Sequence, residues 1–545
     1  MVFPTRRSSI APRVALGRSR QALRAWGWVA SGALALLSTL GLCLVDPLDQ
    51  ILSWQTTLQP GTLAYTFWDQ PLDVLYIRTF IFNITNAEAF LSGEEKMNLQ
   101  EIGPFVYREV TVFANLTVHD NDTASFSANR TLEFLPHLSV GDPKDYVVTV
   151  PNLPLLGAAA MLGESALVTN LALRSLALFV GATPLLTMTA DKVLWGYDDP
   201  LVSMAHSVAP SFVDFKRLGL LDRMYTEVDD VVVRAGRNGG VDPKAKVAED
   251  VYSIQTYRGA TGFPHWGHGV QPRFDPLTGE ALPAHLSCDT VQGSYEGVLF
   301  PRNVRPEQRM YVYRKQFCRS APIVYQNDGF TEEGYRYMLY HVDMNPLIDP
   351  DDPESQCYCT RTFGSNSGCV PPGFSSIAPC FYKMPVALSQ PHLMDAQPAL
   401  QNKLTGLNPN RDEHLSYFRL QPETGIPLNI RCRLQINLMM GHTRLSITQP
   451  FDHMALPIMW VDMTMDLPDN YKRLVHLAVI VGPAAQTALL VLSALAGAAM
   501  VAWGLVLRRR LHASGDRRLS ERARSPLAPS LHLTQRLTQH MDSVH

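Results

Sequence analysis

The residues best placed to do chemistry in this chain are cysteines, because four of the eight lie within residues 357–380. Four clustered thiols form either a zinc site or disulfides. Structural zinc sites use closely spaced pairs, such as C-x2-C with a matching second pair. Here the four cysteines are separated by one, nine and ten residues, so two matching pairs are absent. The spacing favours disulfides, if the segment lies in an oxidising compartment.

Two apolar segments decide the compartment. Residues 26–45 and 475–507 carry no formal charge, and each is long enough to cross about 30 Å of hydrocarbon. The alternative for residues 26–45 is a cleaved signal peptide. The long basic region before this segment and the lack of a small-residue cleavage site after it argue against that alternative. Residues 1–25 hold six arginines and no acid, and residues 508–545 hold eight arginines and three acids. The positive-inside bias predicts two cytoplasmic tails, the second disordered, and a lumenal or extracellular ectodomain over residues 46–474.

The ectodomain sequence agrees with this topology. It contains four N-glycosylation sequons, at Asn83, Asn115, Asn121 and Asn129. It has 33 basic and 47 acidic residues, and this excess of negative charge makes it a poor nucleic-acid binder.

Seven cysteines lie in the ectodomain. In an oxidising compartment they are expected to form disulfides, and because their number is odd, one cysteine should stay unpaired. In the stretch 430–438, apolar residues including Cys432 alternate with polar ones. Strict alternation predicts a half-buried strand with Cys432 on its apolar face. Cys432 is therefore expected to be a free, buried thiol that packs as a small hydrophobe.

The organisation of the ectodomain is mixed, and the expected fold class is α+β. Residues 61–150 are rich in β-branched and aromatic residues, as strands are. Residues 155–182 are rich in alanine and leucine and predict helices, either in a core or facing lipid. Their charged and amide side chains argue against a third span. Short strands and turns follow to about residue 470.

Several motifs, in one order over nearly the whole chain, resemble the class B scavenger receptor family, which includes fatty-acid translocase, the high-density-lipoprotein receptor and lysosomal integral membrane protein. The motifs are EIGPFVYRE (101–109), LWGYDDPL (194–201), FCRS (317–320), CYC (357–359), SQPHLMDAQP (389–398), GLNPNRDEHLSYFRLQPETGIPL (406–428) and RLQINL (433–438).

The resemblance implies a large antiparallel β-barrel with an internal hydrophobic tunnel, capped by an apical helical bundle at about residues 155–195. It also implies the disulfides Cys288–Cys357, Cys318–Cys380 and Cys359–Cys369, which leaves Cys432 free. The candidate ligand-docking residues at the apex are Leu173, Leu176, Phe179 and Val180. Leu434 and Ile436 are candidates for residues that face the tunnel.

The implied function is a receptor that binds lipids or lipoprotein particles and passes fatty acids, sterols or cholesteryl esters to the membrane. The alternatives are a trafficking receptor for a protein cargo bound at the apex, and a sensory co-receptor for hydrophobic odorants. Homo-oligomerisation stays open. Arg174 is the only basic residue of the apex before Asp191. Relatives that capture anionic ligands resemble one another in having lysines there. No acidic dileucine signal occurs in the C-terminal tail, which favours the plasma membrane over the lysosomal or endosomal membrane.

Other chemistry is weakly supported. His265 and His268 have the spacing of a ligand pair but no third partner in sequence, and residues 411–414 suggest a solvated turn. The chain has no nucleophile elbow, phosphate-binding loop or H-E-x-x-H motif, so neither an enzyme nor a cofactor is expected.

Overall fold

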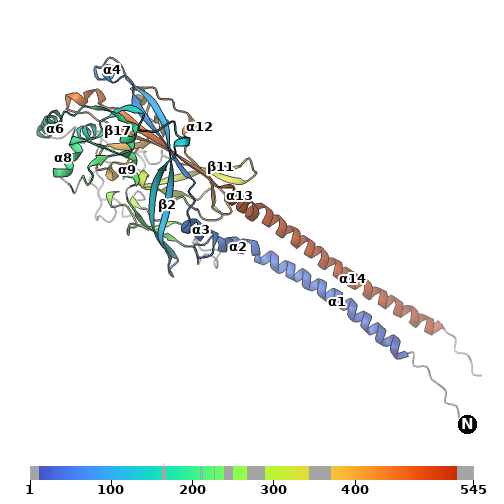
Figure 1. Cartoon of the computed structure of the whole chain (residues 1–545). Coiled ribbons are helices and arrows are strands. Elements are labelled where there is room, and N and C mark those ends of the chain that lie inside the picture. The colour runs from blue at the N-terminus through green and yellow to red at the C-terminus, as the bar shows by residue number, and fades with distance from the viewer. Residues whose placement is uncertain are drawn as a thin grey trace, which may run out of the picture. The chain divides into compact units, whose positions relative to one another are not determined.

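The structure is a computed structural model of the 545-residue chain (Figure 1). It describes residues 11–162, 167–208, 210, 213–225, 227–237, 250–266, 289–342 and 370–524. The chain divides into two compact units: a terminal unit, made of Met1–Gln50 and Ala478–His545, and a central unit, Ile51–Leu477.

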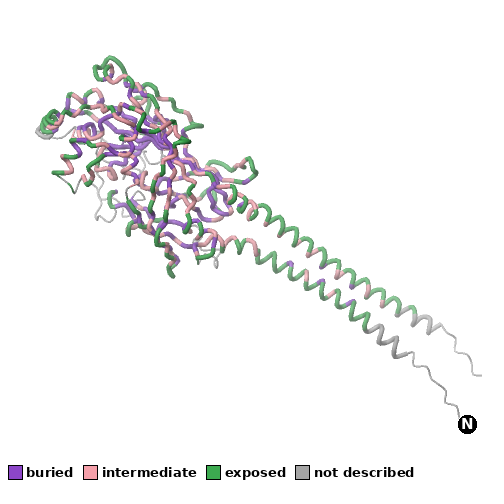
Figure 2. Tube along the Cα trace, in the orientation of Figure 1, coloured by how far each residue is buried: buried purple, intermediate pink, exposed green. Residues whose placement is uncertain are grey.

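The terminal unit contains two long helices, α1 (Ala11–Val45) and α14 (Gly482–Arg524). They belong to two stretches that are long and apolar enough to cross a membrane, Arg20–Gln55 and Asp469–Ser514. Figure 2 shows both helices exposed along most of their described length. Water does not tolerate so much exposed apolar helix, whereas lipid does. The two expected spans fall inside these stretches.

Small residues let α1 and α14 approach closely. A β-carbon on Gly32 would lie 2.6 Å from the carbonyl oxygen of Gly497, and one on Gly504 would lie 2.8 Å from that of Ala25. The hydroxyl oxygens of Thr39 and Ser493 are 2.6 Å apart and hydrogen-bonded. Close backbone contact and an interhelical hydrogen bond are how helices associate in lipid, where burial of apolar surface gives no drive.

The central unit is built on a 14-stranded sheet. Every pairing is antiparallel except that of β15 with β2. The main strand order is β10-β11-β12-β16-β17-β18-β1-β2-β3-β8-β9, with β13, β14 and β15 off this path. The bounds are β1 (Leu75–Ile84), β2 (Met97–Val118), β3 (Thr123–Phe134), β8 (Asp229–Arg234), β9 (Ile254–Tyr257), β10 (Met310–Tyr313), β11 (Ser320–Phe330), β12 (Arg336–Val342), β13 (Phe374–Ser376), β14 (Val386–Ser389), β15 (Leu404–Thr405), β16 (Tyr417–Leu420), β17 (Pro427–Met439) and β18 (Ala455–Asp466).

The sheet does not close into the continuous barrel that the family resemblance implies. Its end strands β9 and β10 are not paired with each other. Tyr295 lies between them: its N–H donates to the carbonyl oxygen of Tyr311 (2.8 Å), and the N–H of Ile254 donates to the carbonyl oxygen of Ser294 (2.7 Å). An irregular segment thus fills the gap with isolated bridges, because it makes too few consecutive bonds to form a strand.

The alternation predicted for residues 430–438, which lie in β17, is correct for 430–434 only. Ile430, Cys432 and Leu434 are buried and Arg431 is half-buried, as a one-sided strand requires. Further along, the polar residues Gln435 and Asn437 are fully buried as well. Residues 389–392 contact both side chains: the amide of Asn437 donates to the hydroxyl of Ser389 (2.9 Å), and the N–H of His392 donates to the side-chain oxygen of Gln435 (2.6 Å).

Helices cover one end of the central unit. They are α5 (Leu153–Leu162), α6 (Leu167–Val180), α7 (Ala190–Trp195), α8 (Pro200–Val208) and α9 (Leu220–Tyr225), with the small sheets β4 (Val147–Pro151)–β5 (Leu185–Thr189) and β6 (Tyr197–Asp198)–β7 (Arg217–Leu218). Leu155, Ala177 and Leu201 join α5, α6 and α8 around one buried cluster. The other α-helices in the described part of the chain are α2 (Pro47–Gln55), α3 (Leu63–Asp69), α4 (Ala87–Leu91), α11 (Pro398–Gln401), α12 (Arg411–His414) and α13 (Asp469–His476).

Within the central unit, α6 and α8 lie at the end opposite to α3 and α13 (Figure 1). The ring centroids of Phe67 in α3 and Tyr471 in α13 are 5.0 Å apart. Since α13 begins the second apolar stretch, this end is where the chain continues into its two candidate spans.

Candidate functional site

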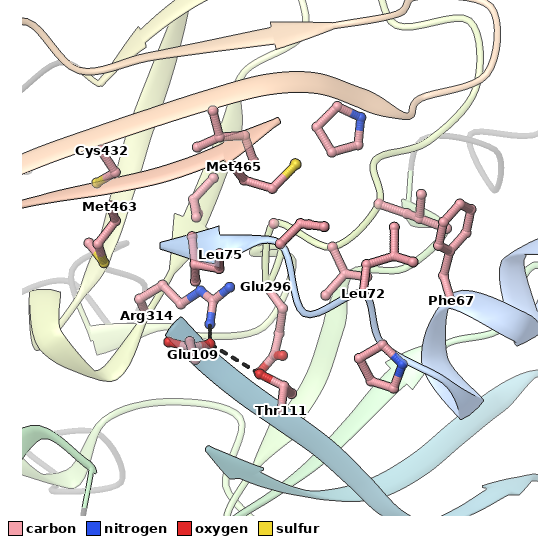
Figure 3. Close-up of a pocket in the computed structure, with 18 of the residues that line it drawn as sticks. Phe67, Leu72, Leu75, Glu109, Thr111, Glu296, Arg314, Cys432, Met463 and Met465 are labelled. Carbon is pink, nitrogen blue, oxygen red and sulfur yellow. Dashed lines mark hydrogen bonds and ion pairs between the residues drawn. The ribbon is translucent and has the colours of Figure 1, made fainter. Parts of the chain in front are cut away.

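Apolar side chains of α3 and the large sheet line a cavity of ≈130 Å³ inside the central unit (Figure 3). Its apolar lining includes Phe67, Leu72, Leu75, Met463, Met465 and Leu467. Leu467 lies two residues before the second apolar stretch, and Phe67 packs on Tyr471 within that stretch. The apolar part of the cavity therefore reaches the end of the unit from which the chain enters its candidate spans.

Four charged side chains, Glu109, Arg130, Glu296 and Arg314, line the other part of the cavity. Together with Asp229, which contacts Arg130, they form an interior ion cluster. Arg130 contacts all three acids, at 2.8 Å from Glu296, 3.7 Å from Glu109 and 3.8 Å from Asp229. Arg314 lies 3.5 Å from Glu109. The three carboxylates are only 3–5% exposed. Such a group persists inside a protein only if its charges are paired.

Arg130 holds the interior ion cluster together. Burial alone would lower its pKa, but the carboxylates of Glu296, Glu109 and Asp229 outweigh burial and raise it. Glu109 has neutral partners as well: the hydroxyls of Thr111 and Tyr225 each donate to its carboxylate at 3.1 Å.

Two further cavities continue from the interior ion cluster. A small one of ≈20 Å³ shares Arg130, Glu296 and Arg314 with the apolar cavity. It shares Tyr257, Tyr313 and Lys315 with a larger side pocket of ≈460 Å³ that is also lined by Cys380. The ion cluster thus separates the apolar cavity from the side pocket.

The predicted tunnel-facing residues lie on the correct face of β17 but not at the cavity. Leu434 and Ile436 are buried, yet the cavity is lined by Ile430 and Cys432, which come earlier on the same face. The period of a strand selects a face, but the neighbouring segments determine how far along it the space extends.

Cys432 is a free, buried thiol that lines the cavity. Burial is the main reason that its pKa is raised to about 12 from an ordinary value near 9. At pH 8 the thiolate fraction, and with it the alkylation rate, is expected to be about a thousandfold lower than in the unfolded chain. Timed labelling with iodoacetamide and mass spectrometry, with and without denaturant, measures this ratio. Equal rates in both states would contradict the burial of Cys432.

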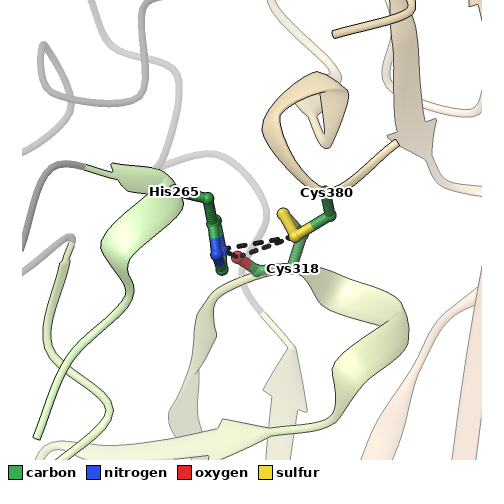
Figure 4. Close-up of side chains that lie close together, drawn as sticks. All are labelled: His265, Cys318 and Cys380. Atoms are coloured by element: carbon green, nitrogen blue, oxygen red, sulfur yellow. Dashed lines mark hydrogen bonds between the residues drawn. A yellow bond between two sulfur atoms is a disulfide. The ribbon is translucent and has the colours of Figure 1, made fainter. Parts of the chain in front are cut away.

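A disulfide joins Cys318 to Cys380, 62 residues apart, as the resemblance implies (Figure 4). The pairs Cys288–Cys357 and Cys359–Cys369 lie outside the described residues. His265 sits against this disulfide, with Nε2 3.3 Å from the sulfur of Cys380. These side chains have the arrangement of metal ligands, but both sulfurs are bonded to each other, so no thiolate is available. His268 lies outside the described residues.

The apical candidates divide by burial. Leu173 is buried, and Leu176 and Val180 pack on the cluster that joins α5, α6 and α8, so these three stabilise the bundle. Phe179 is 84% exposed. Leu171 and Leu178, which the sequence interpretation did not single out, are exposed on the same helix. Helical apolar residues alone do not reveal which turn faces a neighbour, which explains the mixed outcome.

Three of the four sequon asparagines, Asn115, Asn121 and Asn129, are exposed on or between β2 and β3. Asn83 in β1 is half-buried, and its side-chain oxygen accepts the N–H of Thr149 at 2.8 Å. Glycosylation of all four stays a prediction, with Asn83 the least accessible.

The expected solvated turn at residues 411–414 is wrong for His414, which is buried and stacks on His392 with ring centroids 4.6 Å apart. Burial and the neighbouring His392 lower its pKa to about 4. His392 contacts Glu101 at 2.8 Å, so this pair anchors the loop to β2.

Sequence reasoning missed the interior ion cluster, although a signal for it exists. Glu109 has the same strand parity as the buried Tyr107 and Phe113, and Arg130 has that of the buried Phe126 and Ala128. A charge in the inward phase of a strand indicates a paired interior charge.

These features define an α+β protein with a large antiparallel sheet, an apolar cavity lined by that sheet and two helices able to cross a membrane. The chain belongs to the CD36 family, whose sequence profile matches residues 30–508. It is 26% identical to scavenger receptor class B member 1 of Sus scrofa over 451 residues, which cover 81% of each chain. It is 26% identical to lysosome membrane protein 2 of Homo sapiens over 425 residues, or 77% of this chain and 80% of that protein. The family resemblance of the sequence motifs is confirmed.

Proposed function

We propose that this protein is a membrane-anchored scavenger receptor that binds lipid or lipoprotein at its helical end and passes hydrophobic molecules through its interior to the membrane. The observation that carries the proposal is the apolar cavity, whose apolar part reaches the end of the central unit that continues into the spans. Transfer of each exposed CH₂ from water is favourable by about 0.8 kcal/mol, so an apolar route lowers the barrier without catalysis. Flux then follows the concentration gradient.

The exposed apolar residues of α6 supply a docking surface. Leu171, Leu178 and Phe179 are at least 59% exposed at the end opposite to α3 and α13. The small cavity and the larger side pocket lie on the other side of the interior ion cluster from the apolar cavity. In the proposed topology the central unit is extracellular, both tails are cytoplasmic and the protein resides in the plasma membrane.

Uptake by transfected cells tests the proposal. Cells that express the chain, with surface staining to confirm exposure, are expected to take up fluorescent fatty acid several-fold faster than mock-transfected cells. A parallel assay with cholesteryl ester shows which lipid class passes. Surface protein without uptake of either lipid would contradict transport and favour capture of a protein at α6. Protein confined to acidic vesicles would overturn the plasma-membrane assignment instead.

A further inference from the structure

The interior ion cluster contains one arginine that is only weakly engaged. Among the described residues, Arg314 has a single ion-pair partner, Glu109, at 3.5 Å. Its side chain is 24% exposed and lines the apolar cavity. Arg130 differs, because it is 13% exposed and contacts three carboxylates. A guanidinium has five N–H donors in a planar fork, so Arg314 retains donors that point to no described acidic partner.

Glu109 can release Arg314 without becoming an unpaired buried charge. It keeps Arg130 at 3.7 Å and the hydroxyls of Thr111 and Tyr225 at 3.1 Å. Figure 3 shows Arg314 and Glu109 together at the polar part of the cavity, away from Phe67 and Leu72. A second carboxylate approaching from the cavity thus meets an arginine whose present partner is already satisfied.

The cavity size limits what accompanies that carboxylate. An apolar protein cavity of about 150 Å³ binds benzene, so the ≈130 Å³ cavity has room for about six carbon atoms of a chain. The fused rings of a sterol exceed this space. A single acyl chain can enter the cavity, and the rest of a longer chain extends past Phe67 toward α13.

We propose that Arg314 is the head-group site for a single-chain monocarboxylate lipid, whose carboxylate replaces Glu109 on the guanidinium while its chain fills the apolar cavity. This rests on the proposed function and names its ligand class and orientation. Arg314 is chemically suited, because a guanidinium and a carboxylate form two parallel hydrogen bonds, stronger than bonds between neutral groups. The acid then binds with its head at the interior ion cluster and its chain toward α3. A methyl ester of the same acid carries no charge and cannot form this ion pair with Arg314.

Titration of full-length protein in lipid nanodiscs with decanoate and with methyl decanoate tests the assignment. Empty nanodiscs correct for partitioning into lipid. Arg314→Gln is expected to weaken decanoate binding at least tenfold and to change methyl decanoate binding less than twofold, the ratio that a charge-assisted pair supports. Arg314→Lys keeps the charge but not the fork and is expected to fall between the two.

Arg431→Gln is the matched control, because Arg431 is a half-buried arginine on the opposite face of β17 and pairs with Asp466 at 3.3 Å. It should leave both affinities unchanged, and thermal melting of every variant checks the fold. The head-group assignment would be overturned if Arg314→Gln lost affinity for decanoate and methyl decanoate equally. It would also be overturned if the wild type bound the two equally or bound neither. If uptake by wild-type cells persists in those cases, only this inference fails and the proposed transport stands.

Discussion

Substitution of Ile430 by tryptophan is expected to reduce fatty-acid uptake at least tenfold while the protein still reaches the cell surface. Ile430 is buried, lies next to Cys432 on the inward face of β17 and lines the apolar cavity. The indole enters existing space and occupies much of the room for a chain, instead of being forced into a packed core. A strained substitution in a filled core would destabilise the protein by about 1–3 kcal/mol, and here the cavity absorbs part of that cost.

Arg431→Trp is the control for this experiment, since it places the same bulk one residue along the strand on the opposite, half-buried face. Uptake per surface molecule should stay within twofold of wild type in the control. Ile430→Trp with unchanged uptake and intact surface staining would show that lipid does not travel through this cavity. Equal losses in both variants would point to a general effect of tryptophan on β17.

Replacement of Arg130 by methionine is expected to lower the free energy of unfolding by about 3–5 kcal/mol, because it leaves buried carboxylates without their shared partner. Glu296 loses its 2.8 Å contact, and Glu109 and Asp229 lose one contact each. Methionine keeps most of the volume, so the effect reports charge more than packing. Thermal melting of the purified protein and the fraction that reaches the cell surface measure the loss.

The pair Arg108–Glu133 provides the comparison. It also joins β2 to β3, at 2.5 Å, but its side chains are 36% and 54% exposed. Arg108→Met is therefore expected to lower the melting temperature much less than Arg130→Met. A second substitution, Glu296→Gln, should restore part of the stability in the Arg130→Met background, because it removes one of the unpaired charges. Similar losses for the two arginine variants would refute the central role of Arg130.

The two candidate spans and the family could be predicted from the sequence because their signals are local. Charge-free stretches of sufficient length, arginine-rich tails and ordered motifs are all read without knowing which segments meet. The Cys318–Cys380 bond was available only through the family resemblance, because nothing in the sequence near either cysteine identifies its partner 62 residues away. Alternation in residues 430–434 also placed Cys432 correctly, because a strand of period two fixes the face of each side chain.

The functional interior was decided by tertiary structure. Glu109, Arg130, Asp229, Glu296 and Arg314 come from segments up to 205 residues apart, and only the pairing of strands brings them to one place. The cavity ends near Cys432, short of Leu434 and Ile436, because the packing of other segments sets its limits. Gln435 and Asn437 are buried because the segment 389–392 contacts their side chains. Sequence periodicity determines which face a residue takes; the space it meets there depends on long-range packing.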